Sequence, residues 1–432
     1  MTSNSIVELN QQLDDALHPD FCGDDFWIAR PHLAKCFKDG LSGPSMSRLK
    51  VKRRLTQHLF MLKKAGSYAD AEGVLIAWKT TNQYRALGAL PSRSEQAIRV
   101  PTAVRLGALK STSSTEAKAW IRALEFRMLE IGDVDPVLLR RLFRTVSLER
   151  SSFNWILQNH DARCAVVAAQ DSVQARSVCA AAREASIPTV YIPHAPFNFS
   201  RNYADIPTDY AALRGVSEID SYRALGADAN RLFAVGCPSL SPDSPANKDS
   251  KPSQEQPIVV APSPWNEHTL GAFFRTLSPV LSEVPHILAP HPRSNRKVLM
   301  RQAPGSARLL EGKTTAEVLQ DGAKALIQHS SGVALEGMLR GVPVIELTLG
   351  RQNPHYPCIR EPHAYLAGNS EELSQIIRSL DTTEDPMRVS ERMAWAKTWC
   401  EHLGYEAQQK LDQLLAGPLY SIGPVFDAWR RT

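Results

Sequence analysis

The sequence lacks any apolar run long enough to cross a membrane. A spanning helix needs about 20 consecutive apolar residues, and no stretch of the 432 residues reaches that length. The first fifteen residues, MTSNSIVELNQQLDD, are polar and acidic, whereas a secretory signal peptide has an apolar centre behind a basic start. We therefore expect a cytoplasmic protein.

Paired cysteine motifs are also missing. The seven cysteines lie far apart, their number is odd, and no CxxC occurs. Disulfide frameworks usually contain an even number of cysteines, and zinc sites usually contain closely spaced pairs. The sequence therefore predicts neither a disulfide framework nor a zinc site, and a reducing cytosol fits this composition.

The net charge of +5 is too small to indicate nucleic-acid binding by itself. Basic residues are concentrated in residues 30–64, which contain ten Lys or Arg and one acid, Asp39, among apolar residues. Such a segment can lie on an anionic membrane surface, here the inner face of the cytoplasmic membrane, or form a solvated helix face. No helix-turn-helix, zinc or aromatic-stacking pattern accompanies the charge, so we expect no nucleic-acid partner.

What the chain does contain is a regular alternation of short apolar runs and helical patterns. Runs such as Tyr210–Leu213 and Ile258–Ala261 are typical of buried parallel strands. Residues 241–257, SPDSPANKDSKPSQEQP, interrupt the alternation and are typical of a linker. The pattern predicts two doubly wound, Rossmann-like α/β domains facing across a cleft. We place the domains at residues 1–240 and 258–410, with residues 411–432 packing back on the first.

The clearest unit lies within residues 325–350, where an apolar strand, a polar turn, a short helix and a second strand follow one another. The turn carries Ser330, Ser331 and Gly332 at the predicted helix N-terminus, which suits a phosphate group. Glu336, one to two turns into the helix, is placed to accept hydrogen bonds from a ribose. The simpler interpretation is that the serines only cap the helix.

Other polar residues also follow predicted strands. They are Asp171, His194, Arg214, Ser263, His291, Arg293, Ser330 and Ser331. Ligands of open parallel sheets bind beyond the carboxyl ends of the strands. We therefore expect these side chains to line the cleft between the domains.

Four short motifs resemble those of a known enzyme class. His291-Pro292 and Ser330-Ser331 resemble the His-Pro and Ser-Ser motifs of bacterial sialyltransferases, polysialyltransferases, capsular Kdo transferases and CDP-glycerol polymerases, which have the GT-B fold. Residues 336–344, EGMLRGVPV, resemble a motif of capsule-synthesis proteins, and residues 261–265, APSPW, a loop of CDP-glycerol transferases. The resemblance covers roughly residues 160–350.

The resemblance implies an inverting, metal-independent glycosyltransferase that uses a CMP-activated sugar, Kdo or sialic-acid-like, to build a capsule or lipopolysaccharide. Its partners would be that nucleotide sugar and a glycan or lipid-linked acceptor, with no separate cofactor. His291 would stabilise the charge that develops on the departing CMP. The implied nucleotide-binding residues are Ser263, His291, Arg293, Ser330, Ser331, Gly332 and Glu336.

The sequence departs from these families at the general base. They carry two acids before a glycine in the first domain, whereas residues 105–111 read RLGALKS here. A base is still needed to deprotonate an attacking hydroxyl, and Asp171, then His194, then Asp24 or Asp25, are the candidates. Three other functions stay open. They are a CDP-glycerol or CDP-ribitol phosphotransferase, a UDP-sugar transferase or epimerase, and an inactive nucleotide-sugar-binding protein.

Overall fold

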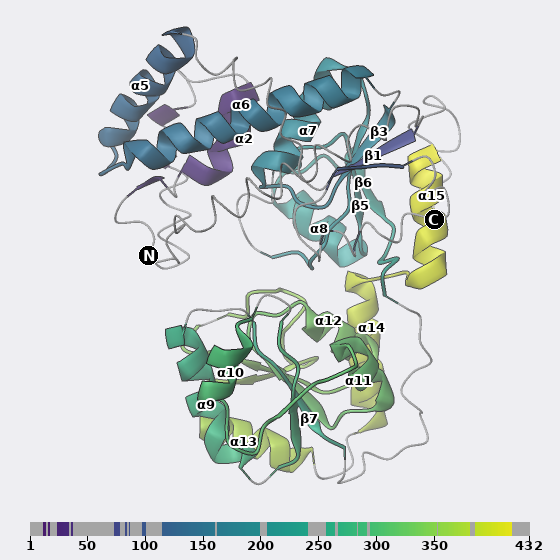
Figure 1. The fold of residues 1–432 in the computed structure, drawn as a ribbon. Helices are drawn as coiled ribbons and strands as arrows, with labels where there is room; N and C mark the ends of the chain where they lie inside the picture. The colour runs from purple at the N-terminus through teal and green to yellow at the C-terminus, as the bar shows by residue number, and fades with distance from the viewer. Residues whose placement is uncertain are drawn as a thin grey trace.

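The fold consists of two α/β lobes, one above the other in Figure 1, which we take from a computed structural model. The structure describes residues 12–13, 16–17, 24–33, 36–37, 73–77, 83, 86, 97–100, 115–159, 162–198, 205–240, 256–263, 267–282, 284–291, 294–351, 353–380 and 385–416. Most of the basic segment 30–64, residues 105–111 and residues 241–255 of the expected linker lie outside these ranges.

The N-terminal lobe is built on a parallel sheet whose described strands have the order β2-β1-β3-β4-β5-β6. These strands are β1 (Gly73–Ala77), β2 (Ala97–Val100), β3 (Ala162–Val167), β4 (Thr189–Tyr191), β5 (Tyr210–Leu213) and β6 (Leu232–Ala234). Side chains alternate between the two faces of a strand, and in β3 both faces are buried. This explains why the strands have continuous apolar sequences rather than alternating ones.

Helices on one side of this sheet form a second core of their own. They are α2 (Asp24–Leu33), α5 (Thr115–Leu129), α6 (Pro136–Asn159) and α7 (Val173–Glu184). Helix α8 (Val216–Ala224) instead contributes Tyr222 to the core cluster that reaches the C-terminal lobe. Leu124, Met128, Phe143 and Val146 of α5 and α6 are buried with residues of α2, which places this helical layer beyond α7 and away from the C-terminal lobe.

The C-terminal lobe contains the second parallel sheet, with the described order β12-β11-β10-β7-β8-β9. Its strands are β7 (Ile258–Ala261), β8 (His286–Leu288), β9 (Arg308–Leu309), β10 (Ala325–Gln328), β11 (Val344–Leu347) and β12 (Tyr365–Ala367). The strands β7 and β10 are neighbours at the centre of the sheet. The chain continues outward from β7 to β8 and β9 on one side, and from β10 to β11 and β12 on the other. Ligands of doubly wound sheets bind at such a switch point, so the edge between β7 and β10 is where a ligand is expected.

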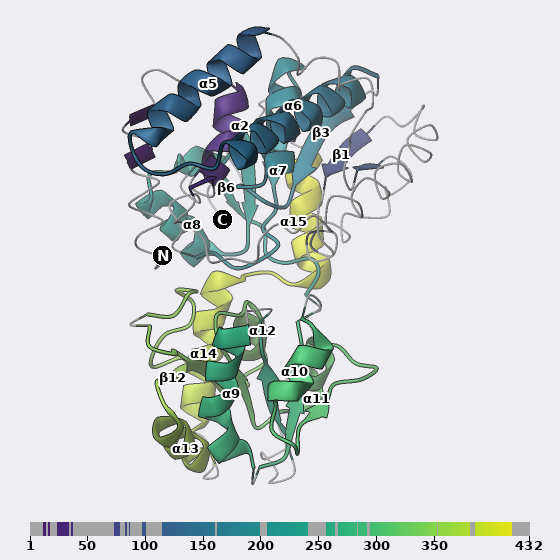
Figure 2. The same cartoon turned by 60° about the vertical axis from the view of Figure 1, so that its left-hand side comes forward.

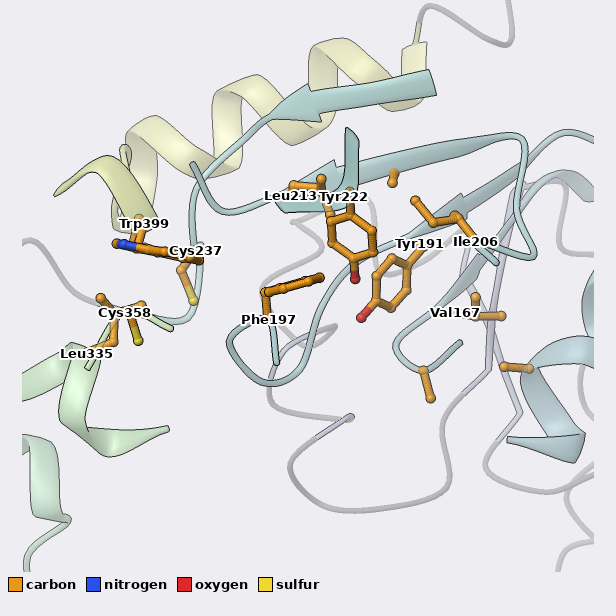
Figure 3. Close-up of a cluster of buried hydrophobic side chains, with 14 of the residues drawn as sticks. Val167, Tyr191, Phe197, Ile206, Leu213, Tyr222, Cys237, Leu335, Cys358 and Trp399 are labelled. Carbon is orange, nitrogen blue, oxygen red and sulfur yellow. The ribbon is translucent and has the colours of Figure 1, made fainter. Parts of the chain in front are cut away.

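Two helical layers cover this sheet. The helices are α9 (Glu267–Leu281), α10 (Arg296–Gln302), α11 (Thr315–Asp321), α12 (Val333–Leu339), α13 (Ser370–Ser379) and α14 (Pro386–Trp399). The apolar residues of α9 and α13 share one core cluster with the sheet. Those of α11, α12 and α14 share another, which continues into the N-terminal lobe and includes Leu213, Tyr222 and Cys237 (Figure 3).

The chain returns to the N-terminal lobe after α14. Figures 1 and 2 show α14 in the lower lobe and α15 (Gly404–Ala416) along the upper one, joined by a short segment. Leu411, Leu414 and Leu415 of α15 pack on the face of the N-terminal sheet opposite α7, with Cys164 and Val166. The predicted domain boundaries stay predictions, but both lobes have the doubly wound arrangement that the sequence predicted. No helix among the described residues is long and apolar enough to span a bilayer.

Two glycines make close backbone contacts where the lobes join. A Cβ atom at Gly215 would lie 2.5 Å from the carbonyl oxygen of Thr398. A Cβ atom at Gly236 would lie 2.1 Å from the carbonyl oxygen of His402, and Gly236 has a φ of +93°. Real Cβ atoms do not approach other heavy atoms so closely, so the returning chain lies against these two positions because they lack side chains.

Candidate functional site

Loops at the carboxyl edges of the two sheets contact each other. The loop after β4, which contains Pro196 and Asn198, contacts two loops of the other lobe. A Cβ atom at Gly332 would lie 2.8 Å from Pro196 Cδ, so the turn after β10 lies against that ring. The Nδ2 amide of Asn198 donates a hydrogen bond of 3.1 Å to Nε2 of His355, in the loop after β11. Loops that follow strands of both lobes are thereby brought together, while the prediction that the polar residues named above line a shared site stays a prediction.

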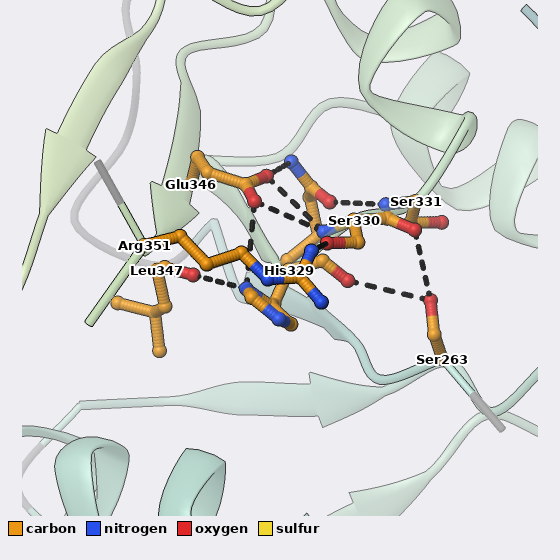
Figure 4. Close-up of polar contacts among 8 residues, drawn as sticks. Ser263, His329, Ser330, Ser331, Glu346, Leu347 and Arg351 are labelled. Carbon is orange, nitrogen blue, oxygen red and sulfur yellow. Dashed lines mark hydrogen bonds and ion pairs between the residues drawn. The ribbon is translucent and has the colours of Figure 1, made fainter. Parts of the chain in front are cut away.

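A buried carboxylate shapes the turn after β10 (Figure 4). Glu346 of β11 accepts a hydrogen bond of 3.0 Å from the backbone N–H of Ser330, and another from the side-chain amide of Gln328. Gln328 in turn accepts one of 2.7 Å from the backbone N–H of Ser331. Ser330 adopts the left-handed conformation, with φ of 53°. Since Gln328 and Glu346 are almost fully buried, they fix the turn from inside the domain.

This network changes the expected role of the turn. The prediction that Ser330 and Ser331 direct unused N–H groups at a phosphate is wrong, because both N–H groups donate to buried side chains. The capping interpretation is also wrong, since the N-cap residue of α12 is Gly332 and no side chain caps the helix. The Ser330 hydroxyl accepts a hydrogen bond of 2.7 Å from Arg351, which follows β11 and is exposed.

The sheet order places the other predicted C-terminal residues at the same edge. Ser263 follows β7, next to β10, and its hydroxyl lies 3.4 Å from the carbonyl oxygens of His329 and Ser330. His291 follows β8, one strand further, which corresponds to roughly 10 Å from the Ser330 turn at ordinary strand spacing. Arg293 lies outside the described residues. Nucleotide binding by these residues stays a prediction.

Glu336 is partly buried in the first turn of α12, on the side of the domain junction. Burial raises its pKa to about 7, against the lowering effect of the neighbouring Arg340 charge. Charges of the N-terminal lobe also act on it, with Cys237 raising the pKa and Arg214 lowering it. A carboxyl group with this pKa is half protonated at neutral pH, so it can both donate and accept hydrogen bonds to a hydroxyl-rich ligand.

Sequence reasoning missed the residues that support the turn. His329 is buried, its Nδ1 hydrogen-bonds to the carbonyl oxygen of Leu347, and it lies 3.5 Å from Glu346. Gln328 and Glu346 are polar residues in otherwise apolar strands, which is a sign of internal hydrogen bonding. Arg351 was missed because it belongs to no motif, although it follows a strand as the other candidates do.

In the N-terminal lobe, the first two base candidates both lie at the carboxyl edge of the sheet. Nδ1 of His194 hydrogen-bonds to the carbonyl oxygen of Ala168, at the end of β3. A carbonyl only accepts, so Nδ1 carries the proton and Nε2 is the basic nitrogen. Asp171 is exposed after β3, and Ser172 rather than Asp171 caps α7, by accepting a bond of 3.1 Å from Ala175 N–H.

Asp24 and Asp25 lie elsewhere. Both belong to the first turn of α2 and form ion pairs of 3.1 and 2.9 Å with Arg150 of α6. Asp24 also pairs with Arg183 of α7, at 3.4 Å. These contacts tie helices together in the outer layer of the N-terminal lobe, and they give both carboxylates a structural explanation.

A buried arginine lies between the two sets of strand ends. Arg214 follows β5, is 7% exposed, and donates a long hydrogen bond of 3.4 Å to the carbonyl oxygen of Pro193. Burial acts to lower its pKa, but the charges of Cys237 and Glu218 prevail and raise it. Burial raises the pKa of Glu218 to about 7 even beside this arginine. The junction therefore holds a permanent positive charge next to groups that can each carry a negative one.

Comparison with known proteins gives a fold but no close relative. No family model matches the sequence, and no curated protein sequence matches it. Among solved structures, the chain is similar to UDP-N-acetylglucosamine (UDP-GlcNAc) 2-epimerases. That of Neisseria meningitidis, bound to UDP-GlcNAc, is 13% identical over 80% of this chain and 100% of its own, with a TM-score of 0.53.

Two further epimerases give similar values. The Methanocaldococcus jannaschii protein, in complex with UDP-GlcNAc and UDP, is 15% identical over 80% of this chain and 100% of its own, with a TM-score of 0.52. The Rickettsia bellii protein is 13% identical over 81% of this chain and 98% of its own, with a TM-score of 0.52. These likenesses confirm the predicted GT-B fold of two Rossmann-like domains.

The same comparison corrects the predicted function. The sequence motifs favoured a transferase that uses a CMP-activated sugar, but the similar structures are enzymes of UDP-GlcNAc. The CMP-sugar prediction is therefore wrong, and with it the narrower resemblance to Kdo transferases and sialyltransferases. A His-Pro and a Ser-Ser dipeptide were too short to discriminate between nucleotides. The Ser-Ser dipeptide also has a structural explanation, because the backbone N–H groups of Ser330 and Ser331 donate hydrogen bonds to buried side chains.

Proposed function

We propose that the protein is an enzyme that acts on a UDP-activated sugar, with UDP-GlcNAc as the first substrate to test. The observation that carries the proposal is the contact between the loop after β4 and the turn after β10, which brings loops at the carboxyl edges of the two sheets together. The chain has the fold of proteins that bind UDP-GlcNAc in the same two-lobed arrangement. An inactive binding protein would have the same fold, so turnover must be measured.

The C-terminal lobe would hold the UDP moiety. Glu336 would bind the ribose, because a carboxyl group suits a diol. Among the described residues at this edge, Arg351 and His291 are two groups that can offer positive charge to the diphosphate. Negative charge grows on UDP as its bond to the sugar weakens, and preorganised positive groups stabilise that charge in the transition state. This scheme does not require the backbone N–H of Ser330 or Ser331 to donate a hydrogen bond to the diphosphate.

The N-terminal lobe would supply acid–base chemistry to the sugar. His194 presents Nε2 as the basic nitrogen, with its orientation fixed by the Ala168 carbonyl. Asp171 is a second group at the same edge. An epimerase must remove one proton and return another, whereas a transferase needs one base for an acceptor hydroxyl. Two titratable groups on one edge satisfy either reaction, and the fold comparison makes epimerisation the first one to assay.

Ligand binding is tested by thermal unfolding with UDP, UDP-GlcNAc, CMP and CDP at equal concentrations. A ligand at 100 times its Kd stabilises the folded state by about 2.7 kcal/mol. We expect protection by UDP and UDP-GlcNAc that exceeds protection by CMP. The variant Arg351→Met should weaken protection by UDP, while Arg378→Met, which removes an exposed arginine of α13, should not. Stronger protection by CMP, or none by any nucleotide, would refute the proposal.

The reaction itself is tested with UDP-GlcNAc alone and with added acceptor sugars. Proton NMR follows the sugar signals, and a coupled assay follows free UDP. A second UDP-sugar signal without acceptor would identify an epimerase. UDP release that depends on an acceptor would identify a transferase. Binding without either change would leave a nucleotide-sugar-binding protein and would exclude the enzymatic proposal.

A further inference from the structure

Two segments that join the lobes touch each other. The first follows β6 and contains Cys237, just before the chain leaves for the C-terminal lobe. The second joins α14 to α15 and contains Cys400 to Leu403. Cys237 forms a parallel bridge with Leu403, and its N–H donates a hydrogen bond of 2.8 Å to the carbonyl oxygen of His402. The two segments are thus fixed side by side at the junction.

Each segment carries a buried thiol, and the two thiols contact each other. Cys237 is 7% exposed and Cys400 is fully buried. Their side chains are hydrogen-bonded to each other, and the Ser239 hydroxyl lies 3.4 Å from Cys237 Sγ. Figure 3 shows Cys237 beside Trp399, which precedes Cys400 in the chain. A disulfide needs two sulfur atoms in direct reach, and the contact between these side chains brings their sulfur atoms together.

The surroundings make the two thiols chemically unequal. The hydrogen bond from Cys400, then the charge of Arg214 and the Ser239 hydroxyl, lower the pKa of Cys237 against the effect of burial. The same hydrogen bond and burial raise the pKa of Cys400. By contrast, burial raises the pKa of Cys164 to about 12, since that thiol lies in the apolar sheet core. A thiolate beside a thiol is the usual arrangement of a reactive dithiol pair.

We propose that Cys237 and Cys400 are a redox modification site, in which a small peroxide converts the dithiol to a disulfide that ties the two segments joining the lobes. The bond would link the end of β6 to the α14–α15 junction and restrict motion between the lobes. The modification is independent of the substrate proposed above, since it needs neither the Ser330 turn nor a nucleotide.

The reaction with hydrogen peroxide balances in two steps. The Cys237 thiolate attacks one oxygen, the O–O bond breaks, and the departing hydroxide takes a proton to form water, leaving a sulfenic acid on Cys237. The Cys400 sulfur then attacks the Cys237 sulfur, the S–O bond breaks, and the second hydroxide leaves as water with the Cys400 proton. Two thiols have then given two electrons to one peroxide. Since both sulfur atoms are buried, hydrogen peroxide should react well and glutathione disulfide poorly.

The test treats the native full-length protein with hydrogen peroxide, blocks remaining thiols with iodoacetamide, and identifies peptides by mass spectrometry. We expect a cross-linked pair containing Cys237 and Cys400, 2 Da lighter than the two free peptides and restored by dithiothreitol. Cys164 and Cys179, each with a pKa raised to about 12 by burial, should remain reduced. The expectation of 2 Da is the mass of the two hydrogens lost in disulfide formation.

Cysteine-to-serine variants test whether the cross-link is specific to Cys237 and Cys400. Cys358 is buried in the same cluster, and Cys358→Ser should leave the cross-link unchanged, whereas Cys237→Ser and Cys400→Ser should abolish it. Circular dichroism checks that each variant is folded. If one is not, the cross-link in the peroxide-treated wild-type protein still tests the proposal. A native protein whose Cys237 stays alkylatable after peroxide, or which pairs Cys237 with Cys358, would overturn the proposal.

Discussion

Gly236 and Gly226 offer a matched test of the contact that joins the lobes. Their φ values are nearly equal, at +93° and +92°, but a Cβ atom at Gly226 would meet nothing within 4 Å, while one at Gly236 would lie 2.1 Å from the His402 carbonyl oxygen. Alanine at either position is strained by about 1–2 kcal/mol, because L residues disfavour positive φ. Any further loss at Gly236 therefore measures the contact.

The additional loss can be worked from the structure. To admit a Cβ atom, the backbone at His402 must move away, which breaks the 2.8 Å hydrogen bond from Cys237 N–H. Leaving such a buried donor unsatisfied costs about 1–3 kcal/mol. We therefore expect Gly226→Ala to lose about 1–2 kcal/mol and Gly236→Ala about 2–5 kcal/mol. With a urea slope of about 2–3 kcal/mol per M, the two midpoints should differ by roughly 1 M.

Urea unfolding followed by circular dichroism and by tryptophan fluorescence measures both variants. Trp399, one of eight tryptophans in the chain, lies at the junction, so part of the fluorescence change comes from this region. Equal losses for the two variants would refute the reasoning, since they would mean that the returning chain does not press on Gly236. A larger loss for Gly226→Ala would refute it as well.

Three further predictions concern the site. Glu346→Gln places an amide against the Gln328 amide, so a charged hydrogen bond is lost and a buried donor is left unsatisfied. We expect the free energy of unfolding to fall by about 2–4 kcal/mol. Thermal unfolding without ligand measures this loss, and an unchanged midpoint would contradict the buried network. If His194 is a general acid–base, His194→Gln should lower kcat by a factor of about 10²–10⁴ and leave the protection from thermal unfolding by UDP unchanged. An unchanged kcat would show that His194 takes no part in the reaction. Burial raises the pKa of Glu336 from its ordinary value to about 7, so the folded state binds its proton more tightly and stability falls as pH rises through that interval. Glu336→Gln should therefore gain stability relative to wild type as the pH rises from 5 to 8. Urea unfolding at several pH values measures the two free energies, and a constant difference between them would contradict the raised pKa.

The layered fold was predictable because each buried strand has an apolar sequence. Tyr210–Leu213 and Ile258–Ala261 begin and end in the structure where their apolar runs do. The opposed strand order around β7 and β10 could not be read from single strands, because pairing depends on contacts distant in sequence. The packing of α15 on the first sheet joins residues more than 150 positions apart, so the surface that the helix covers cannot be read from the helix sequence alone.

The sequence predicted that His194, Ser263 and His291 each follow a strand, and in the structure each of them does. That these residues form one site stays a prediction. The role of the Ser330 turn depended on Gln328 and Glu346, whose side chains reach it through the sheet interior. Such hydrogen bonds have no sequence pattern, so the turn was interpreted from its serines alone.

The path of the chain has a consequence for the order in which the protein forms on the ribosome. The N-terminal sheet is complete in sequence at Ala234, but the helix that covers one of its faces begins only at Gly404. At about 5–20 residues per second, translation needs roughly 10–30 s to supply it. Throughout that interval the apolar face around Val166 and Phe233 has no α15 to cover it. The lobe synthesised first is therefore the one that must mature last, and a nascent chain halted before Gly404 should present this face to chaperones.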